Sequence, residues 1–224
     1  MPALVLDLET VPDPDLAWTP RERDGRVQTF PPAPYWQIVA FGALLWDRDG
    51  VRRFGCLGQA GGYTERAALE TFASMLPKLD LLVTWNGRRF DIPVIVARCM
   101  KHRIPLPEYY RDRDMRYRYG GGTGGHLDLA DQLSDYGAGP AAPLDGWAKL
   151  VGLPGKGDVD GSQVAELVAA GELERVRTYC LSDVAQTARL WLEWRYLAGQ
   201  IGLETLEESV RLLGVAVAAG EAVL

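Results

Sequence analysis

The sequence predicts an α/β fold, in which strands form a sheet that helices flank. Short apolar runs that end at turn signals are typical of strands, and they recur through the N-terminal half of the chain. Farther along, apolar residues recur at every third or fourth position, as in helices that pack one face against a core. The chain has 224 residues, 47% of them hydrophobic, so we expect one domain, 1–224, with a core of its own.

The first predicted strand carries two acidic residues on one face. Residues 3–6 are apolar, and Asp7 and Glu9 follow two positions apart. Because successive side chains of a strand point to opposite faces, these two carboxylates share a face. Unpaired carboxylates lose several kcal/mol when they leave water, and a hard cation such as Mg²⁺ or Mn²⁺ would offset that cost. The alternative is an edge strand whose acids are solvated.

A second segment carries one acidic residue, Asp91, after a strand and a turn. The apolar run 81–85 leads into Asn86-Gly87, a strong turn signal, and a helical pattern then extends from Asp91 to about His102. Asp91 precedes Ile92-Pro93, so one interpretation is that it caps the helix. The other is functional, because open α/β sheets bind ligands at the carboxyl ends of their strands.

The third segment, with the fourth acidic residue, lies in a long predicted helix from about Glu172 to Leu197. Tyr179 and Asp183 are four residues apart, which places them on one face of this helix. A phenol and a carboxylate can therefore serve one site together. Next to them, apolar residues three, four or seven positions apart form the predicted core face: Val176, Cys180, Val184, Trp191 and Trp194.

The remaining predicted elements complete the domain. Residues 36–46 and 51–58 are predicted to form a hairpin that turns near Asp49-Gly50. Asp128 lies on a predicted strand after His126, where it is either an outer acid of the site or a hydrogen-bonding residue at the strand end. A helix at 203–219 is predicted to pack on its own domain, with a partner contact as the alternative.

These acidic segments resemble the motifs of the DEDD superfamily of 3′-to-5′ exonucleases. The first motif, Asp-x-Glu, matches Asp7 and Glu9, and the second and third match Asp91 and Asp183. The subclass called DEDDy has a tyrosine four residues before the last aspartate, as Tyr179 is here. More narrowly, the segments NGRRFDIPVI, HLDLADQLS and LVGLPGKGDVDGSQV resemble a bacterial family of stand-alone exonucleases similar to the proofreading domain of family-B DNA polymerases.

The resemblance extends over residues 3–197 and implies a ribonuclease-H-like fold, a central mixed sheet flanked by helices. It also implies two divalent metal ions, Mg²⁺ or Mn²⁺. Asp7, Glu9 and Asp183 are expected around one ion, Asp7 bridges to the second, and Asp91 binds the second directly or through water. Tyr179 is expected to orient the water that attacks the terminal phosphodiester, so that a nucleoside 5′-monophosphate is released.

The expected substrate is a single-stranded nucleic acid with a free 3′ end. DNA is favoured over RNA because the resemblance is to polymerase proofreading domains. A ribonuclease D-like exoribonuclease uses the same residues and is one alternative, and a catalytically inactive nucleic-acid-binding or adaptor domain is the other. No polymerase partner can be named. We also predict four substrate-binding residues: Thr10, Asn86, Phe90 and Lys156.

Composition excludes some other classes of protein. A net charge of −6 argues against a protein that coats nucleic acid through bulk electrostatics, but an exonuclease grips only a few terminal nucleotides. An odd number of cysteines, three, argues against a disulfide framework. The N-terminus lacks a basic targeting region, and no apolar run is long enough to cross a membrane. We therefore expect a cytoplasmic protein with no membrane association.

Three segments leave alternatives open. The proline-rich connection 12–34 follows the acidic strand and forms either a lid or wall of the site or a surface loop. Residues 109–119 mix arginines with tyrosines, which either bind a nucleic-acid strand or lead into the next strand of the sheet. In the glycine-rich loop 152–158, Lys156 either holds a substrate phosphate or is solvated.

Overall fold

The computed structural model describes residues 2–23, 25–59, 62–111, 125–140, 142–155 and 160–220. Its strands are β1 Ala3–Pro12, β2 Arg21–Arg23, β3 Arg26–Gln28, β4 Trp36–Asp47, β5 Gly50–Cys56, β6 Leu81–Thr84 and β7 Gly125–Asp128. Its α-helices are α1 Glu65–Met75, α2 Asp91–His102, α3 Pro107–Arg111, α4 Leu129–Leu133, α5 Leu144–Leu150, α6 Val164–Ala169, α7 Leu173–Leu197 and α8 Leu203–Ala219. Short 3₁₀ helices span Ala33–Tyr35, Leu76–Lys78 and Gly161–Gln163.

Five strands form a mixed sheet in the order β5-β4-β1-β6-β7. β1 runs antiparallel to β4, and β4 antiparallel to β5, whereas β1, β6 and β7 run parallel to one another. This arrangement confirms the predicted α/β fold with a central mixed sheet. Because β1 and β6 are parallel, their carboxyl ends lie at the same edge of the sheet, and β1 continues beyond the last pair, Val5 with Val83.

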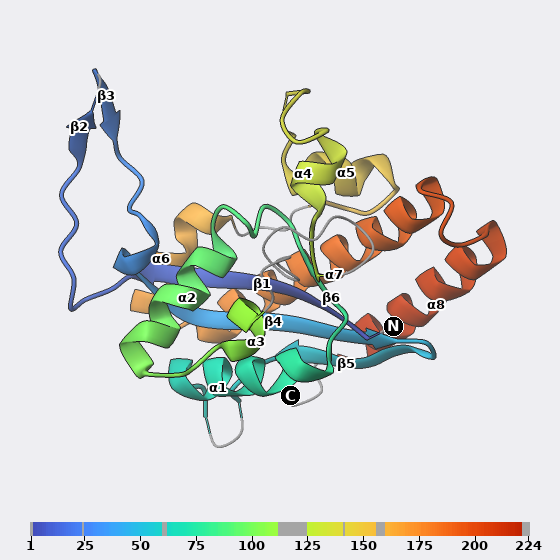
Figure 1. Ribbon diagram of the computed structural model, residues 1–224, viewed down its shortest axis with the longest axis horizontal. Coiled ribbons are helices and arrows are strands. Elements are labelled where there is room, and N and C mark those ends of the chain that lie inside the picture. Colours follow the sequence, from blue (N-terminus) through green and yellow to red (C-terminus); the bar gives the residue numbers. More distant parts are fainter. Residues whose placement is uncertain are drawn as a thin grey trace.

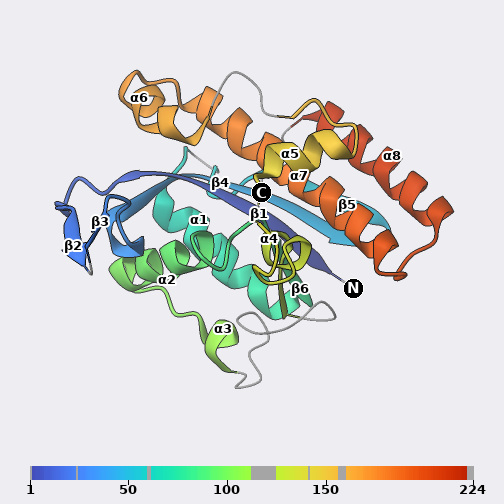
Figure 2. The ribbon, with the colours of Figure 1, turned by 90° about the horizontal axis from the view of Figure 1, so that it is seen from above.

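The two faces of the sheet pack against different helices. On β1, Leu4, Leu6 and Leu8 belong to a core shared with α1 and α2. Ala3 and Val5 point the other way, into a core shared with α7 and α8. Figure 2 shows the sheet edge-on between these two layers, with α7 and α8 on one side and α1 and α2 on the other. Asp7 and Glu9 follow Ala3 and Val5 at every second position of β1, so their side chains also point toward the α7 side.

Local sequence explains where several elements begin and end. α1 starts after Thr64, whose hydroxyl accepts a hydrogen bond from the backbone N–H of Ala67 at 3.1 Å. The β4–β5 hairpin turns at Gly50, whose φ of +108° is a conformation that L side chains rarely adopt. α2 ends at His102, and its C-cap residue, Arg103, is in the left-handed conformation with φ 57°.

The predicted helices at the C-terminal end agree closely with the structure. α7 begins at Leu173 and ends at Leu197, as expected for the helix predicted from about 172. α8 coincides with the predicted 203–219. Leu206 and Leu213 are buried in the core that α7 shares, so the apolar stripe of α8 packs on its own chain.

The connection 12–34 contains a small hairpin, β2 with β3, that the sequence did not predict as strands. Figure 1 shows this hairpin projecting beyond the other elements at the end of β1. Of the segment 109–119, Tyr109, Tyr110 and Arg111 are described, in α3, and the expectation for Tyr117 and Tyr119 lies outside the described residues. Among the described helices, none is long and apolar enough to cross a membrane. All three cysteines are free thiols.

Candidate functional site

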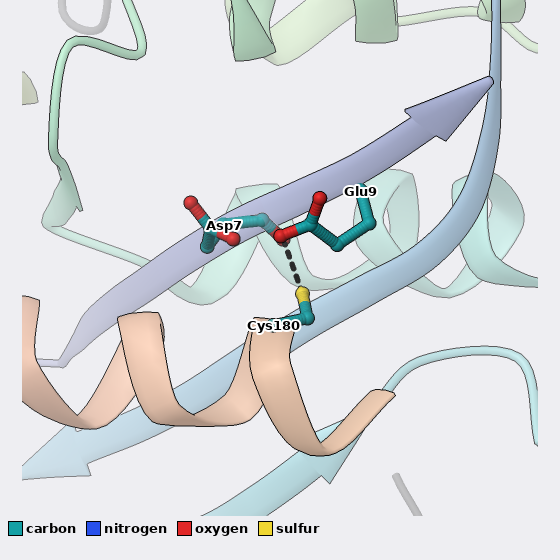
Figure 3. A group of neighbouring side chains, drawn as sticks. All are labelled: Asp7, Glu9 and Cys180. Atoms are coloured by element: carbon teal, nitrogen blue, oxygen red, sulfur yellow. Dashed lines mark hydrogen bonds between the residues drawn. The ribbon is translucent and has the colours of Figure 1, made fainter. Parts of the chain in front are cut away.

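Asp7 and Glu9 lie near each other at the end of β1. One oxygen of each carboxylate and the Cys180 sulfur of α7 all lie within 4.8 Å of one another (Figure 3). A β-bulge follows Glu9, where the register between β1 and β4 shifts. Bulges are frequent next to active sites because they redirect a side chain and end regular pairing. The strand therefore presents two acids toward α7 just before its regular pairing is interrupted.

Gly42 allows α7 to approach this strand closely. In the β1–β4 register Gly42 is the partner of Asp7. A Cβ atom at position 42 would lie 2.8 Å from both Cys180 Sγ and Val184 Cγ2, so a larger residue would push α7 away. Gly42 was not among the predicted residues, although a lone glycine inside the strand run IVAFGALLW is a signal of close backbone approach.

Tyr179 and Asp183 of α7 are adjacent, as the spacing of four predicted. Burial raises the pKa of Tyr179 above its ordinary value, and the negative charges of Asp183, Glu9 and Asp7 raise it further. The Tyr179 hydroxyl donates a hydrogen bond to the Asp183 carboxylate. Tyr179 is therefore a neutral phenol that faces three of the predicted site acids.

Asp91 joins the site from the opposite helix layer, at the first turn of α2. The cap interpretation was wrong, because the N-cap residue of α2 is Phe90 and Asp91 is already helical. Burial, with the charge of Asp128, raises the pKa of Asp91 to about 7, although hydrogen bonds from the backbone N–H groups of Asp91 and Leu8 lower it. Leu8 lies between Asp7 and Glu9 on β1, so its hydrogen bond holds the Asp91 carboxylate beside these two acids.

The electrostatics of Asp7 tie the four acids together. Burial raises the pKa of Asp7 well above its ordinary value, and the charges of Glu9, Asp91 and Asp183 raise it further, in that order. Asp7 Oδ2 is enclosed and accepts no hydrogen bond from the described part of the chain. An enclosed carboxylate oxygen surrounded by other carboxylates is the arrangement that a cation stabilises.

Cys180 is close enough to the acids to be considered a ligand, and a hydrogen bond from its thiol lowers the pKa of Asp7. The Gly42 N–H donates to Sγ at 3.2 Å, and the thiol contacts the backbone carbonyl of Asp7 at 3.4 Å. Burial raises the pKa of Cys180 well above its ordinary value, which keeps the thiol protonated. The donor set that remains consists of carboxylates, which suit hard ions such as Mg²⁺ or Mn²⁺ rather than soft ones.

The predicted substrate-binding residues are placed unequally. Thr10 is half-buried on β1 directly after the bulge. Asn86 is exposed in the turn after β6, with a φ of 59° that fits the predicted Asn-Gly turn. Phe90 is half-buried and its ring lies 5.9 Å from that of Trp36. Lys156 lies outside the described residues.

Asp128 forms hydrogen bonds at the end of its strand, as one of the two interpretations of this residue predicted. It is 1% exposed at the end of β7, and its carboxylate accepts hydrogen bonds from the backbone N–H groups of Asn86 (2.8 Å), Arg88 (2.9 Å) and Ala130 (3.1 Å). These bonds attach the turn after β6 to the start of α4. Asp128 thus holds the segment that leads to Asp91.

The sequence also gave no indication of a buried ion cluster on the α2 side. The guanidinium of Arg98 contacts the carboxylates of Asp13 and Glu65, and all three side chains are buried. Glu65 also contacts the His102 ring and accepts a hydrogen bond from the Ile38 N–H, each within 2.8 Å. Because these partners are far apart in the chain, no local pattern could have identified them.

Comparison with known proteins gives a family and a similar fold. Residues 28–222 match a family described as a predicted 3′-5′ exonuclease related to the exonuclease domain of PolB. This range includes Asp91, Tyr179 and Asp183 and begins after Asp7 and Glu9. No curated protein sequence matches the chain significantly.

Among solved structures, the family B DNA polymerase of Pyrobaculum calidifontis is similar, with a TM-score of 0.57 and 20% sequence identity. The similarity covers 88% of this chain but 24% of the polymerase, so the chain spans about a quarter of that protein. At this identity the likeness establishes the fold, the ribonuclease-H-like mixed sheet with flanking helices. With the family match over most of its length, the chain belongs to the predicted 3′-5′ exonucleases related to the exonuclease domain of PolB.

Proposed function

We propose that this protein is a metal-dependent 3′-to-5′ exonuclease of the DEDDy type, which releases nucleoside 5′-monophosphates from single-stranded nucleic acid, with DNA favoured. The observation that carries the proposal is the environment of Asp7, whose pKa the charges of Glu9, Asp91 and Asp183 raise together. Membership of the family supports the direction of hydrolysis, and its relation to PolB supports DNA.

The residues present fit two hard divalent cations, Mg²⁺ or Mn²⁺. Asp7, Glu9 and Asp183 would hold one, and Asp7 with Asp91 would hold the other. The fit rests on the enclosed Oδ2 of Asp7 and on the mutual repulsion of the acids, which positive charge would relieve. When bound, such ions would polarise the scissile phosphodiester and lower the pKa of water.

Tyr179 positions the attacking water in this proposal. Its raised pKa keeps the hydroxyl protonated, and that proton is donated to Asp183. The phenol oxygen is then left as an acceptor for a hydrogen bond from water. Holding the water in line with the phosphorus reduces the entropy that the reaction must lose, which is how a positioning residue raises a rate.

Three residues beside the acids are proposed to contact the terminal nucleotide. Thr10 follows Glu9 on β1, Phe90 precedes Asp91 at the start of α2, and Asn86 is exposed in the turn before α2. They lie on or next to two of the three segments that supply the acids, β1 and α2, so a nucleotide bound at the acids passes near all three. For Lys156 a substrate contact stays a prediction from the sequence.

The test uses DNA and RNA oligonucleotides of one sequence, labelled at the 5′ end and incubated with Mg²⁺, Mn²⁺ or EDTA. A ladder that shortens from the 3′ end, depends on the metal and is faster with DNA is the expected result. Faster digestion of RNA would indicate the ribonuclease D-like alternative. Binding of both polymers without hydrolysis would indicate an inactive adaptor domain.

Two variants locate the activity. Asp7→Asn and Asp183→Asn are expected to lower hydrolysis by roughly a thousandfold or more while the fold is kept. Asp49→Asn removes an exposed charge at the β4–β5 turn and serves as the matched control with unchanged activity.

Mg²⁺ should raise the unfolding temperature of the wild type more than that of Asp7→Asn, because ligands stabilise the state that binds them. Activity near wild type in both acid variants would reject the site.

A further inference from the structure

Residues 13–35 form an arm between β1 and β4. It leaves the sheet directly after the strand that carries Asp7 and Glu9, and its outer part is the β2–β3 hairpin. Figure 1 shows the arm projecting away from the body of the protein, on the side of the sheet where β1 ends. The proposed function assigns nothing to it.

The base of this arm is held firmly. The Asp13 N–H donates to the Tyr35 carbonyl at 2.8 Å, which closes the two ends of the arm on each other. The Asp13 side chain is fully buried and is paired with Arg98 and with Lys101, the latter at 2.8 Å. Burying such charges is costly unless each is paired in good geometry, so the cluster specifies one position for the base.

Phe30 lies on the limb that returns to β4, and its backbone is fixed on both sides. The Gln28 carboxamide donates to the Phe30 carbonyl at 3.3 Å, and the Trp36 indole N–H donates to the Pro31 carbonyl at 2.8 Å. The Phe30 ring centroid lies 5.0 Å from that of Trp36 and 5.7 Å from that of Phe90. Three segments thus supply one aromatic cluster.

One member of this cluster stays in solvent. Phe30 is 59% exposed, although two rings beside it hold its position. A single exposed apolar residue is ordinary, but this one is continuous with Phe90, the residue before Asp91. Exposed aromatic rings next to a site for nucleic-acid ends bind by stacking on bases, and they do so with little sequence preference.

We propose that Phe30, supported by Trp36 and Phe90, stacks on a base of the single-stranded nucleic acid upstream of the nucleotide that is removed. This inference rests on the proposed function and extends its substrate site onto the arm. The Asp13–Arg98 pair holds the arm in place where it leaves the sheet. The arm in turn sets the position of the stacked nucleobase relative to the acids. Phe30 is then a substrate-binding residue outside the acid motifs.

The test compares two substrates that share the reacting nucleotide. One is a single-stranded oligothymidylate, and the other is the p-nitrophenyl ester of thymidine 5′-monophosphate, which has no upstream base. Phe30→Ala is expected to lower the ratio of kcat/KM for the oligonucleotide to that for the ester about 5- to 100-fold, mainly through KM. Val27→Ala, at another exposed apolar residue of the arm (59% exposed), should leave this ratio unchanged.

Two further variants separate stacking from apolar packing. Phe30→Trp keeps an aromatic face and should keep the ratio within about threefold of wild type, whereas Phe30→Leu keeps only apolar volume and should behave as Phe30→Ala. A wild-type ratio in Phe30→Leu or in Phe30→Ala would overturn the proposal. Circular dichroism of each variant checks that the fold is kept.

A failure of the proposed function gives a different result. In that case the wild type would hydrolyse neither substrate in Mg²⁺ or Mn²⁺. The role of Phe30 is then read from fluorescence anisotropy of a labelled oligothymidylate in EDTA. Weaker binding by Phe30→Ala than by Val27→Ala supports stacking, and equal binding overturns it.

Discussion

The backbone N–H of Gly42 donates a hydrogen bond to the thiol of Cys180 at 3.2 Å. Gly42 is the β4 partner of Asp7, and Cys180 is on α7 between Tyr179 and Asp183. This one contact therefore joins the strand beside Asp7 to the helix that supplies the third acidic motif. The relative position of the acids depends on how closely that helix approaches the sheet.

Gly42→Ala is expected to damage both stability and activity. The added Cβ would lie 2.8 Å from Cys180 Sγ and Val184 Cγ2, so α7 must shift. Overpacking of this kind lowers the free energy of unfolding by about 1–3 kcal/mol, and a displacement of about 1 Å at a site can lower a rate about a hundredfold. Urea unfolding and oligonucleotide hydrolysis measure the two effects.

The matched control for this change is Gly146→Ala. A Cβ at position 146, within α5, would meet nothing within 4 Å. The free energy of unfolding should stay the same or rise by about 0.5–1 kcal/mol, because glycine disfavours a helix. If Gly42→Ala behaved like this control, close approach of α7 would not be a requirement of the site.

Hydrolysis by the Cys180→Ala variant is expected to depend on Mg²⁺ as hydrolysis by the wild type does. The thiol bonds to the backbone of Gly42 and Asp7 and to the Asp7 side chain, and burial keeps it protonated, so we expect it to support the structure. Losing the thiol removes its hydrogen bond with Gly42, which lowers the free energy of unfolding by about 0.5–1.5 kcal/mol. Metal titrations of hydrolysis check the expectation, and a folded variant that no longer responds to Mg²⁺ would make Cys180 a ligand.

Tyr179→Phe is expected to lower kcat about ten- to a hundredfold without weakening metal binding. It removes the hydroxyl that donates to Asp183 and keeps the ring in the core formed with α6. Tyr136→Phe, at an exposed tyrosine, is the matched control. The measurements are kcat and the Mg²⁺-induced rise in unfolding temperature. A kcat equal to wild type would remove Tyr179 from the mechanism.

Asp13→Asn is expected to reduce stability at neutral pH more than in acid. Burial alone would raise the pKa of Asp13, but hydrogen bonds from Lys101 and Arg98 lower it from 3.8 to about 2. With the folded-state pKa below the ordinary value, the charged form stabilises the fold above about pH 4, and this contribution disappears as the pH falls toward 2. Urea unfolding of both proteins from pH 7 downward measures the difference.

The outcome that contradicts this prediction is a stability difference that stays constant from neutral pH down to about pH 3. A constant difference would mean that the Asp13–Arg98 contact depends on shape rather than on charge. Asp15→Asn is the comparison, because Asp15 is exposed and its contact with Lys101 is at the surface. Surface pairs contribute about 0–1 kcal/mol, so that variant should be close to wild type throughout.

The local pattern of the sequence was sufficient to predict most of the strands and helices. The alternation at Asp7 and Glu9 predicted a strand, the Asn86-Gly87 step predicted a turn, and the spacing of Tyr179 and Asp183 predicted a shared helix face. Each of these depends on side-chain period or turn chemistry within a few residues, so the sequence alone contains the information. The mixed sheet then followed from resemblance to a family.

Other features depend on residues that are distant in the chain. The sequence allowed Asp91 to be a helix cap, and only the hydrogen bond from the backbone N–H of Leu8, on β1, places its carboxylate at the site. The Asp13–Arg98 pair spans 85 residues, and the Phe30–Phe90 contact joins the arm to α2. None of these pairs has a local signature.

The sequence by itself therefore determined which residues are acidic, which share a face and which segments are strands or helices. The tertiary structure alone decided that Gly42 brings α7 close to Asp7 and that the arm holds Phe30 beside Phe90. The physical reason is the range of the interactions. Backbone periodicity acts between near neighbours, whereas packing, burial and charge act between any groups that folding brings together.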